Sequence, residues 1–143
     1  MTNQVHVAIA ILYQNNQFLL QLRDNIPNIV YPAHWGLFGG HLEAGESPEI
    51  AVKRELLEEI GYTPPKLVKF DCYPDAKAIR HVYYAPLAVE LNTLVLHEGW
   101  DMDFLTIDQI KQGSGYSIKA EGAYPLVPIV QRILVDFQDL NLS

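Results

Sequence analysis

The sequence predicts an α/β fold in which helices cover a mixed β-sheet as an α/β/α sandwich. Several short segments rich in β-branched and aromatic residues alternate with turn signals, as expected of strands. Two well-separated segments carry the start and stop signals of helices. No internal repeat or linker interrupts the 143 residues, so we expect a single domain over residues 1–143.

The chain opens with a predicted pair of strands. Val5–Tyr13 (VHVAIAILY) is apolar and rich in β-branched residues, which indicates a buried strand. Asn15-Asn16 is a turn signal, and Phe18–Arg23 is expected to form the returning strand. The prolines and asparagines of Asp24–Ala33 predict a surface loop.

A short strand over His34–Phe38 is expected to lead into a glycine turn and then a helix. Ser47 is a suitable N-cap, and Pro48 suits the first helical position. The helix should run to about Ile60 and stop at Gly61.

The second half predicts further strands and a C-terminal helix. Arg80–Leu91 is the longest expected strand, with a continuation to Leu96 left open. The other expected elements are strands over Lys66–Tyr73 and Phe104–Thr106, a helical turn over Asp108–Lys111, a loop over Gly113–Gly115 and a helix over Tyr124–Phe137.

Composition and charge narrow the class of partner. A formal net charge of −7 with ten scattered basic residues argues against a nucleic-acid polymer, which requires clustered lysine and arginine. No apolar run is long enough to cross a membrane, and Met1–Gln4 shows no basic segment of a secretory signal. The lone Cys72 fits a reducing compartment, so we expect a cytoplasmic protein.

The predicted helix concentrates acidic residues on one side. At about 100° per residue, Glu55, Glu58 and Glu59 fall within one arc, with Arg54 beside it. The opposite side, with Ile50, Leu56, Leu57 and Ile60, is expected to be the buried face.

Carboxylates held close together repel one another. Two of them about 5 Å apart at an effective dielectric constant of about 20 repel by roughly 3 kcal/mol. Such a group either raises a pKa or binds a cation, and Mg²⁺ prefers oxygen ligands together with substrate phosphates. A solvated acidic face is the alternative, but the glycine turn, Glu46 and Arg54 would then be separate coincidences.

The stretch from Gly40 to Tyr62 resembles the Nudix box, G-x5-E-x7-R-E-U-x-E-E-x-G-U, in which U is a bulky apolar residue. Every fixed position matches, and only Tyr62 is unusual in being aromatic. The box covers 23 of the 143 residues, and the surrounding strands and C-terminal helix are also what that family would show.

The resemblance implies hydrolysis of a nucleoside diphosphate linked to another group, with Mg²⁺ or Mn²⁺ as cofactor. It implies that Glu55, Glu58 and Glu59 bind the metal, with the Gly39 carbonyl as a further ligand. Gly40, Glu46, Arg54 and Gly61 are the box residues expected to support and orient these ligands. Glu55, or a carboxylate from a loop, would act as general base.

The loop carboxylate is sought in His97–Asp103 (HEGWDMD), where the family often places an acid. Glu98 is preferred because the predicted strand would end just before it, and Asp101 and Asp103 are alternatives. An ordinary acidic loop explains the same residues.

Three residues outside the acidic arc are expected to contact substrate. Arg23 is similar to a family position at which a basic residue meets phosphate, and His41 follows the glycine turn. Trp100 would stack on a base. The competing interpretations are a structural surface arginine, an incidental loop histidine and a tryptophan that caps the core.

The substrate is approached by elimination. Lys77, Ala78 and Ile79 stand where subgroups specific for ADP-ribose, dinucleoside polyphosphates or coenzyme A would show a marker. Phe38 replaces the proline that many relatives place before the paired glycines, which bears on specificity and leaves the carboxylates untouched. A nucleoside triphosphate, including an oxidised one, is therefore favoured.

Two other interpretations stay open. One is a nucleotide-sugar or ADP-ribose pyrophosphatase, and the other is a non-catalytic Nudix-fold module that senses a nucleotide. Such modules usually lose box glutamates, and this chain keeps them all. A P-loop enzyme is excluded because no G-x-x-x-x-G-K-[ST] segment is present. Dimerisation is common in the family, but nothing in the chain specifies a homodimer.

Overall fold

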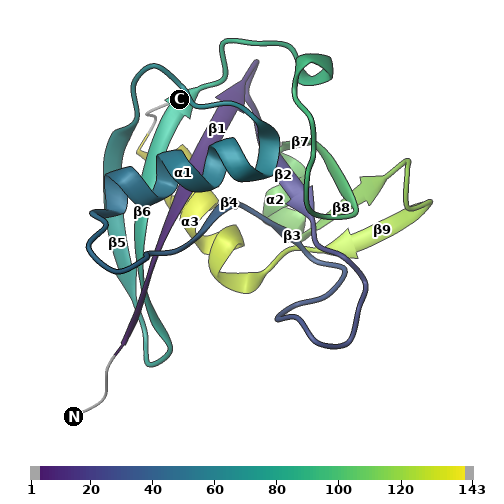
Figure 1. Cartoon of the computed structure of the whole chain (residues 1–143). Helices are drawn as coiled ribbons and strands as arrows, with labels where there is room; N and C mark the ends of the chain where they lie inside the picture. The colour runs from purple at the N-terminus through teal and green to yellow at the C-terminus, as the bar shows by residue number, and fades with distance from the viewer. Residues whose placement is uncertain (1–3, 141–143) are drawn as a thin grey trace. The chain divides into compact units, whose positions relative to one another are not determined.

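A computed structural model describes residues 4–140 (Figure 1). The chain forms two compact units, the first made of Met1–Leu12 and Phe38–His97, and the second of Tyr13–Leu37 and Glu98–Ser143. The predicted single domain over residues 1–143 stays a prediction.

In the first unit, one long helix follows two strands in the sequence and precedes two more. The bounds are β1 (Val5–Gln14, of which the last two residues belong to the second unit), β4 (Phe38–His41), α1 (Pro48–Ile60), β5 (Val68–Pro74), β6 (Ala78–Pro86) and a 3-10 turn η1 (Leu91–Thr93). Strand β1 pairs antiparallel with β4, from Val7↔His41 to Ala10↔Phe38. Strand β6 lies between β1 and β5, and β5 pairs antiparallel with it.

The core of the first unit lies between these strands and α1. The largest fully buried side chains are aromatic or branched aliphatic, and they come from β1, β4 and α1: Ile11, Leu12, Phe38, Leu56 and Ile60. Phe38, which replaces the proline of many relatives, is completely buried. Packing therefore fixes the position at which the glycine turn begins.

The second unit begins with the β1–β2 hairpin. Asn15 and Asn16 have φ values of 52° and 61°, the positive pair that a type I′ turn requires. The bounds are β2 (Gln17–Leu22), β3 (Trp35–Gly36), β7 (Asp101–Thr106), α2 (Ile107–Gln112), β8 (Ser114–Ser117), β9 (Gly122–Pro125) and α3 (Pro128–Asp139). Strand β2 pairs antiparallel with both β3 and β7.

An aromatic core fixes the second unit. Phe137 of α3 contacts both Tyr13 and Phe18, with ring centroids 5.7 and 6.0 Å apart. Trp35 is completely buried, and its indole N–H donates to the Gly115 carbonyl at 2.9 Å. The buried indole thus keeps a hydrogen-bond partner, which avoids the cost of an unpaired donor.

Several predicted boundaries are wrong in the second half of the chain. The strand predicted over Arg80–Leu91 ends at Pro86, because proline cannot donate to a strand ladder. Gly113–Gly115 was expected to be loop, but Ser114–Ser117 pairs with Gly122–Pro125 as a hairpin. The last helix starts at Pro128 and not at Tyr124.

Other predicted elements differ by smaller amounts. The segment His34–Phe38 divides into β3 and β4, which pair with different strands. Strand β7 begins at Asp101, three residues before the predicted start. Within residues 4–140, no helix has both the length and the apolar character needed to span a bilayer.

Candidate metal centre

Local signals set both ends of α1, the helix that carries the acidic residues. The Ser47 hydroxyl accepts a hydrogen bond from the Ile50 N–H at 3.3 Å, and Pro48 occupies the first turn. Gly61 ends the helix in the left-handed region at φ 67°, and its N–H donates to the Leu57 carbonyl. The predicted helix bounds are confirmed to the residue.

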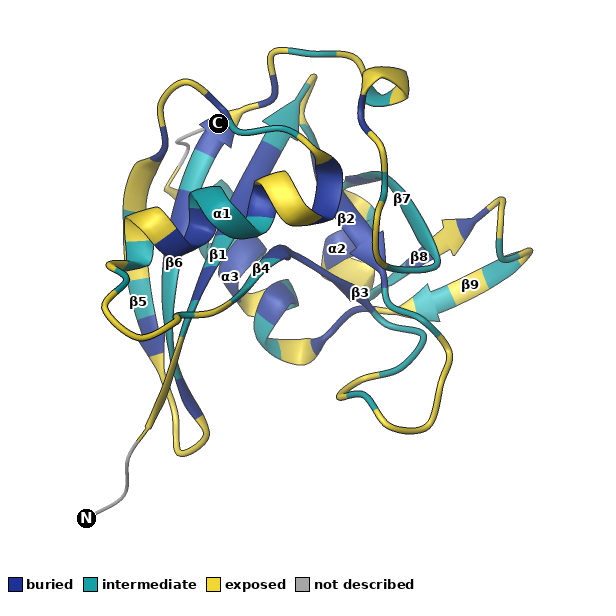
Figure 2. Ribbon diagram, in the orientation of Figure 1, coloured by how far each residue is buried: buried dark blue, intermediate teal, exposed yellow. Residues whose placement is uncertain are grey.

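The acidic arc of α1 overlaps its buried face, and buried, intermediate and exposed residues all occur along this helix (Figure 2). Glu59 retains only 6% of its exposure and lies among Ala51, Val52, Leu56 and Ile60, the other buried residues of the helix. The Glu55 side chain is 18% exposed and that of Glu58 is 58% exposed. A solvated acidic face would leave all three exposed, so that interpretation does not fit Glu55 and Glu59.

The predicted buried face was therefore partly wrong. Ile50 and Leu57 are 58% and 56% exposed, although both were expected to face the core. The sequence interpretation placed burial on the side of the helix opposite the acidic arc. The helix in fact turns Glu59 inward.

The glycine turn accommodates the carboxylates because it has no side chains. Gly39 has a φ of 141°, and a Cβ there would collide with the Ala8 carbonyl and with Ile9 on β1. Its N–H donates to Glu59 Oε2 at 3.1 Å. A Cβ on Gly40 would lie 2.7 Å from the Glu55 carboxylate. Gly39 is thus required by the fold, and Gly40 leaves the place that the Glu55 carboxylate occupies.

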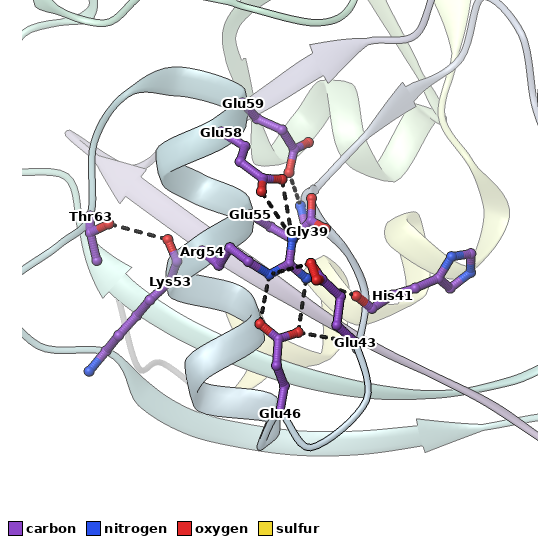
Figure 3. A network of polar contacts seen from close by, with 10 residues as sticks. All are labelled: Gly39, His41, Glu43, Glu46, Lys53, Arg54, Glu55, Glu58, Glu59 and Thr63. Atoms are coloured by element: carbon purple, nitrogen blue, oxygen red, sulfur yellow. Dashed lines mark hydrogen bonds and ion pairs between the residues drawn. The ribbon is translucent and has the colours of Figure 1, made fainter.

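Arg54 joins the loop before the helix to the helix itself (Figure 3). Its Nε and Nη2 donate to the two oxygens of Glu46, at 2.6 and 3.0 Å. Its Nη1 lies 3.1 Å from Glu55 Oε1 and 3.2 Å from Glu58 Oε2. The expected orienting role of Arg54 and the bracing role of Glu46 agree with these contacts.

The charges of this network shift two pKa values. The hydrogen bond with Glu46, followed by those with Glu55 and Glu58, raises the pKa of Arg54 above its ordinary value. The hydrogen bond from Arg54, and next the backbone N–H of Glu43, lower the pKa of Glu46. Both groups therefore stay ionised through the neutral range.

Glu43 also contacts Arg54 and was not singled out from the sequence. Its Oε1 lies 3.3 Å from Arg54 Nε. Glu43 falls among the five unspecified residues between Gly40 and Glu46, so the box pattern gives no signal for it. Its acidic character, in a short loop close to Arg54 in the box, was the one sequence feature that could have indicated this contact.

His41 contributes through its backbone. Its carbonyl accepts a hydrogen bond from Arg54 Nη2 at 3.1 Å, while its side chain is exposed. The substrate contact expected of the His41 imidazole stays a prediction.

The segment after η1 fixes the other end of α1. The N–H of Val95 donates to the Ile60 carbonyl at 3.4 Å, and that of His97 donates to the Glu59 carbonyl at 2.8 Å. These bonds satisfy carbonyls of the last helical turn, which would otherwise lack partners. Glu59 is thus contacted by two segments, by Gly39 through its side chain and by His97 through its backbone carbonyl.

The donor set fits a hard divalent cation. Glu55, Glu58 and Glu59 supply only carboxylate oxygens, and the turn at Gly39 and Gly40 lies directly against Glu55 and Glu59. Within residues 4–140, no three Asp, Glu, His or Cys side chains already converge as a ligand set. Arg54 Nη1 bonds to two of the three carboxylates, those of Glu55 and Glu58.

The other predicted substrate residues belong to the second unit. Arg23 Nε donates to the Val30 carbonyl at 2.8 Å, so this side chain ties the loop between β2 and β3. The backbone N–H of Trp100 donates to the Leu22 carbonyl, and the centroid of its side-chain ring lies 5.3 Å from that of Tyr124. Both Arg23 and Trp100 thus make contacts that fit a structural role. The substrate contacts expected of them stay predictions.

The three candidate acids differ in their position and in their partners. Asp101 and Asp103 were expected in a loop, but both lie on β7, where they pair with Leu22 and Leu20 of β2. Asp101 accepts hydrogen bonds from the Met102 N–H and the Ser117 hydroxyl, at 2.8 and 2.6 Å. Asp103 accepts from the Phe104 N–H at 2.8 Å. Glu98 is exposed and has no hydrogen bond or ion pair with other residues of the described part of the chain.

The reason given for preferring Glu98 was wrong, although the residue itself stays a prediction. Strand β6 ends at Pro86, so Glu98 does not follow a strand end and instead lies in a bend before Gly99.

Comparison with known proteins identifies the family. Residues 2–123 match the model of the NUDIX domain, so the chain belongs to this family. A protein of Bacillus subtilis (strain 168) named "Putative 8-oxo-dGTP diphosphatase" is 32% identical over 81 residues, which are 55% of this chain and 50% of that protein. Nucleoside triphosphatase NudI of Enterobacter sp. (strain 638) is 40% identical over 50 residues, which are 35% of this chain and 36% of that protein.

The chain thus matches half or less of the length of these curated relatives. Their names agree with the expected enzyme class, a hydrolase acting on phosphoric anhydrides.

A solved structure extends the comparison to the fold. The NUDIX domain of Shewanella oneidensis NrtR, in complex with ADP ribose, matches with a TM-score of 0.74 and 20% identity. The match covers 100% of this chain and 91% of that one. The predicted α/β fold with a mixed sheet and the predicted Nudix membership are both confirmed.

Proposed function

We propose that the chain hydrolyses the pyrophosphate linkage of a nucleoside triphosphate, including an oxidised one, and releases a nucleoside monophosphate. The observation that carries this proposal is the placement of Glu55 and Glu59 against the two glycines of the turn. The names of the two curated relatives support the substrate class.

Glu55, Glu58 and Glu59 would hold Mg²⁺ or Mn²⁺, together with the Gly39 carbonyl. When bound, the cation supplies positive charge between an acidic site and the phosphate oxygens, and it favours ionisation of an attacking water.

The chain's own residues orient these ligands. Glu46 accepts hydrogen bonds from two nitrogens of Arg54 and so fixes the orientation of the guanidinium. The Nη1 of Arg54 therefore points at Glu55 and Glu58. The Gly39 N–H donates to Glu59 Oε2 and so fixes the direction of this carboxylate. Ligands held in this way lose less rotamer entropy on binding than free side chains would.

A general base must accept the proton of the attacking water. Glu55 is one proposal, because its side chain is largely shielded from solvent beside Gly40 within the acidic site. Glu98 is the other, because it is the loop acid whose carboxylate other described residues leave uncommitted. A pH–rate profile of Glu98→Gln separates them, since loss of the base removes the acidic limb.

A substrate panel tests the proposed function. It includes ordinary and 8-oxo nucleoside triphosphates, a nucleotide-sugar and ADP-ribose, the last because the Shewanella oneidensis domain was solved with it. Released nucleoside monophosphate is measured with Mg²⁺ and with Mn²⁺. We expect kcat/KM for a triphosphate to exceed that for the other classes by about tenfold, which corresponds to about 1.4 kcal/mol.

The second candidate is a nucleotide-sensing module without catalysis. The complex of the Shewanella oneidensis NUDIX domain with ADP ribose motivates it. Tight calorimetric binding of a nucleotide, with no turnover across metals and pH, would favour this function over hydrolysis. A cytoplasmic location is proposed from the lone Cys72, and a homodimer is left to a measurement of mass in solution.

A further inference from the structure

The guanidinium of Arg54 has two edges that contact different groups of carboxylates. Its Nε and Nη2 face the loop, where they meet Glu43, Glu46 and the His41 carbonyl. Its Nη1 faces the helix, where it meets Glu55 and Glu58. One positive charge is therefore shared between two groups of carboxylates, and only the helix group belongs to the proposed ligand set.

The helix-facing edge of Arg54 competes with a bound cation. Nη1 donates to Glu55 Oε1 and to both oxygens of Glu58, so it engages two carboxylates of the proposed ligand set. Acceptors on the loop side draw the guanidinium toward the loop. The hydrogen bonds from Nη1 to Glu55 and Glu58 are then weaker, and a cation replaces them more easily. Negative charge on the loop side therefore favours metal binding on the helix side.

Glu43 stands on the loop side and its backbone is fixed. Its N–H donates to Glu46 Oε1 at 2.7 Å, and the Glu46 N–H donates to the Glu43 carbonyl at 3.0 Å. Its carboxylate shares Arg54 Nε with Glu46, at 3.3 and 2.6 Å respectively. The side chain of Glu43 is 60% exposed, so its contact with Arg54 is a partly screened one.

We propose that Glu43 is a positioning residue for the metal centre, acting through Arg54. It holds the loop-facing edge of the guanidinium and thereby leaves Glu55 and Glu58 to the cation. This inference rests on the proposed function, because it assumes that the helix glutamates bind a divalent metal. Glu43 lies outside the fixed positions of the box, so the box pattern assigns it no role.

Mn²⁺ binding followed by electron paramagnetic resonance tests the proposal without any turnover. The wild-type protein is compared with Glu43→Gln and with Glu49→Gln at low ionic strength. Glu49 is a matched control, because it is an exposed acid on the first turn of α1 that pairs with Lys53 at 3.7 Å. We expect Glu43→Gln to raise the Mn²⁺ dissociation constant about two- to fivefold, the range of a partly exposed ion pair, and Glu49→Gln to leave it unchanged. Equal effects of the two variants would mean that net charge alone matters, and would overturn the proposal.

A double-mutant cycle asks whether Glu43 acts through Arg54. In an Arg54→Lys background, which lacks the Nε donor, Glu43→Gln should cause no further change in Mn²⁺ affinity. The same fold-change in both backgrounds would overturn the proposal. Thermal unfolding verifies that each variant folds, and Arg54→Gln replaces Arg54→Lys if the latter does not.

The two levels of inference fail differently. Absence of Mn²⁺ binding by the wild-type protein would overturn the proposed metal centre and this role of Glu43 with it. Wild-type binding that Glu43→Gln leaves unchanged would overturn the role of Glu43 alone.

Discussion

Gly40 lies directly against the carboxylate of Glu55, so closely that a Cβ on Gly40 would come within 2.7 Å of the Glu55 Cδ and Oε1. The glycine of the box is thus explained by the position of a neighbouring acid on α1. Backbone strain is not the reason at this residue, because the positive φ of the turn belongs to Gly39.

Gly40→Ala should therefore damage the site more than the fold. The added methyl group displaces the Glu55 carboxylate, and we expect kcat/KM to fall about tenfold or more, equivalent to about 1.4 kcal/mol of transition-state stabilisation. Steady-state kinetics and thermal unfolding of the same sample measure both effects.

Two further glycine variants serve as comparisons. Gly39→Ala meets the backbone of β1 and should lower Tm sharply. Gly45→Ala has φ 82° but no atom within 4 Å of the new Cβ, so it should cost stability without loss of kcat/KM in the folded enzyme. Full activity of Gly40→Ala would show that Glu55 does not need its present position.

The β5–β6 turn should depend on an ionised Asp75. Its Oδ1 accepts the N–H groups of Lys77 and Ala78, and its Oδ2 pairs with Arg80 at 2.8 Å. The Ala78 and Lys77 hydrogen bonds, and then Arg80, lower the pKa of Asp75 to about 2. A depressed carboxyl pKa stabilises the fold above its ordinary value of 3.8 and loses that effect as the pH falls toward about 2.

Asp75→Ala should accordingly lower Tm at pH 7, and the gap to wild type should shrink below about pH 4. Asp75→Asn, which keeps an acceptor oxygen for the turn, should lose less than Asp75→Ala. A gap that stays constant down to pH 2 would contradict the assignment of the shift to Asp75.

A pair of histidines makes the first unit sensitive to mild acid. His81 Nε2 lies 3.0 Å from His6 Nδ1, and His81 Nδ1 is buried with no hydrogen-bond partner in residues 4–140. Burial, and then the charges of His6 and Lys69, lower the pKa of His81 below 6.5. Because the unfolded chain binds this proton at higher pH, stability should fall as the pH drops below about 6.5.

Urea unfolding at pH 7.5, 6.5 and 5.5 checks this pH dependence. His81→Gln should flatten the decrease in unfolding free energy between pH 6.5 and 5.5, and His41→Gln should follow the wild type. Parallel curves for wild type and His81→Gln would assign the acid sensitivity to other groups.

Local chemistry explains why α1 could be predicted so well and its orientation could not. The ends of the helix are set by residues in its own first and last turns, namely Ser47, Pro48 and Gly61. Such local signals can be recognised in the sequence. Which side of the helix is buried depends on the distant glycine turn. Glu59 is buried because Gly39 offers it an N–H, while Ile50 and Leu57 remain exposed although they are apolar.

The β8–β9 hairpin was missed for a related reason. Its strands contain Gly115 and Pro125, residues that indicate turns or a helix start when no partner strand is known. Gly115 suits this closely packed position, because a Cβ would collide with the Leu105 side chain and come within 3.1 Å of the Trp35 indole nitrogen. A contact between positions so far apart in the chain has no local signature.

The metal-dependent hydrolysis of a nucleoside triphosphate by Glu58→Gln tests the central claim most directly. Glu58 is exposed, so its isosteric replacement should leave the fold intact. Removing one carboxylate from the ligand set should lower kcat/KM at a fixed Mg²⁺ concentration by about 10- to 100-fold. Glu49→Gln on the same helix should keep wild-type activity. Wild-type turnover by Glu58→Gln across a Mg²⁺ titration would contradict the account of α1 as the metal-binding element.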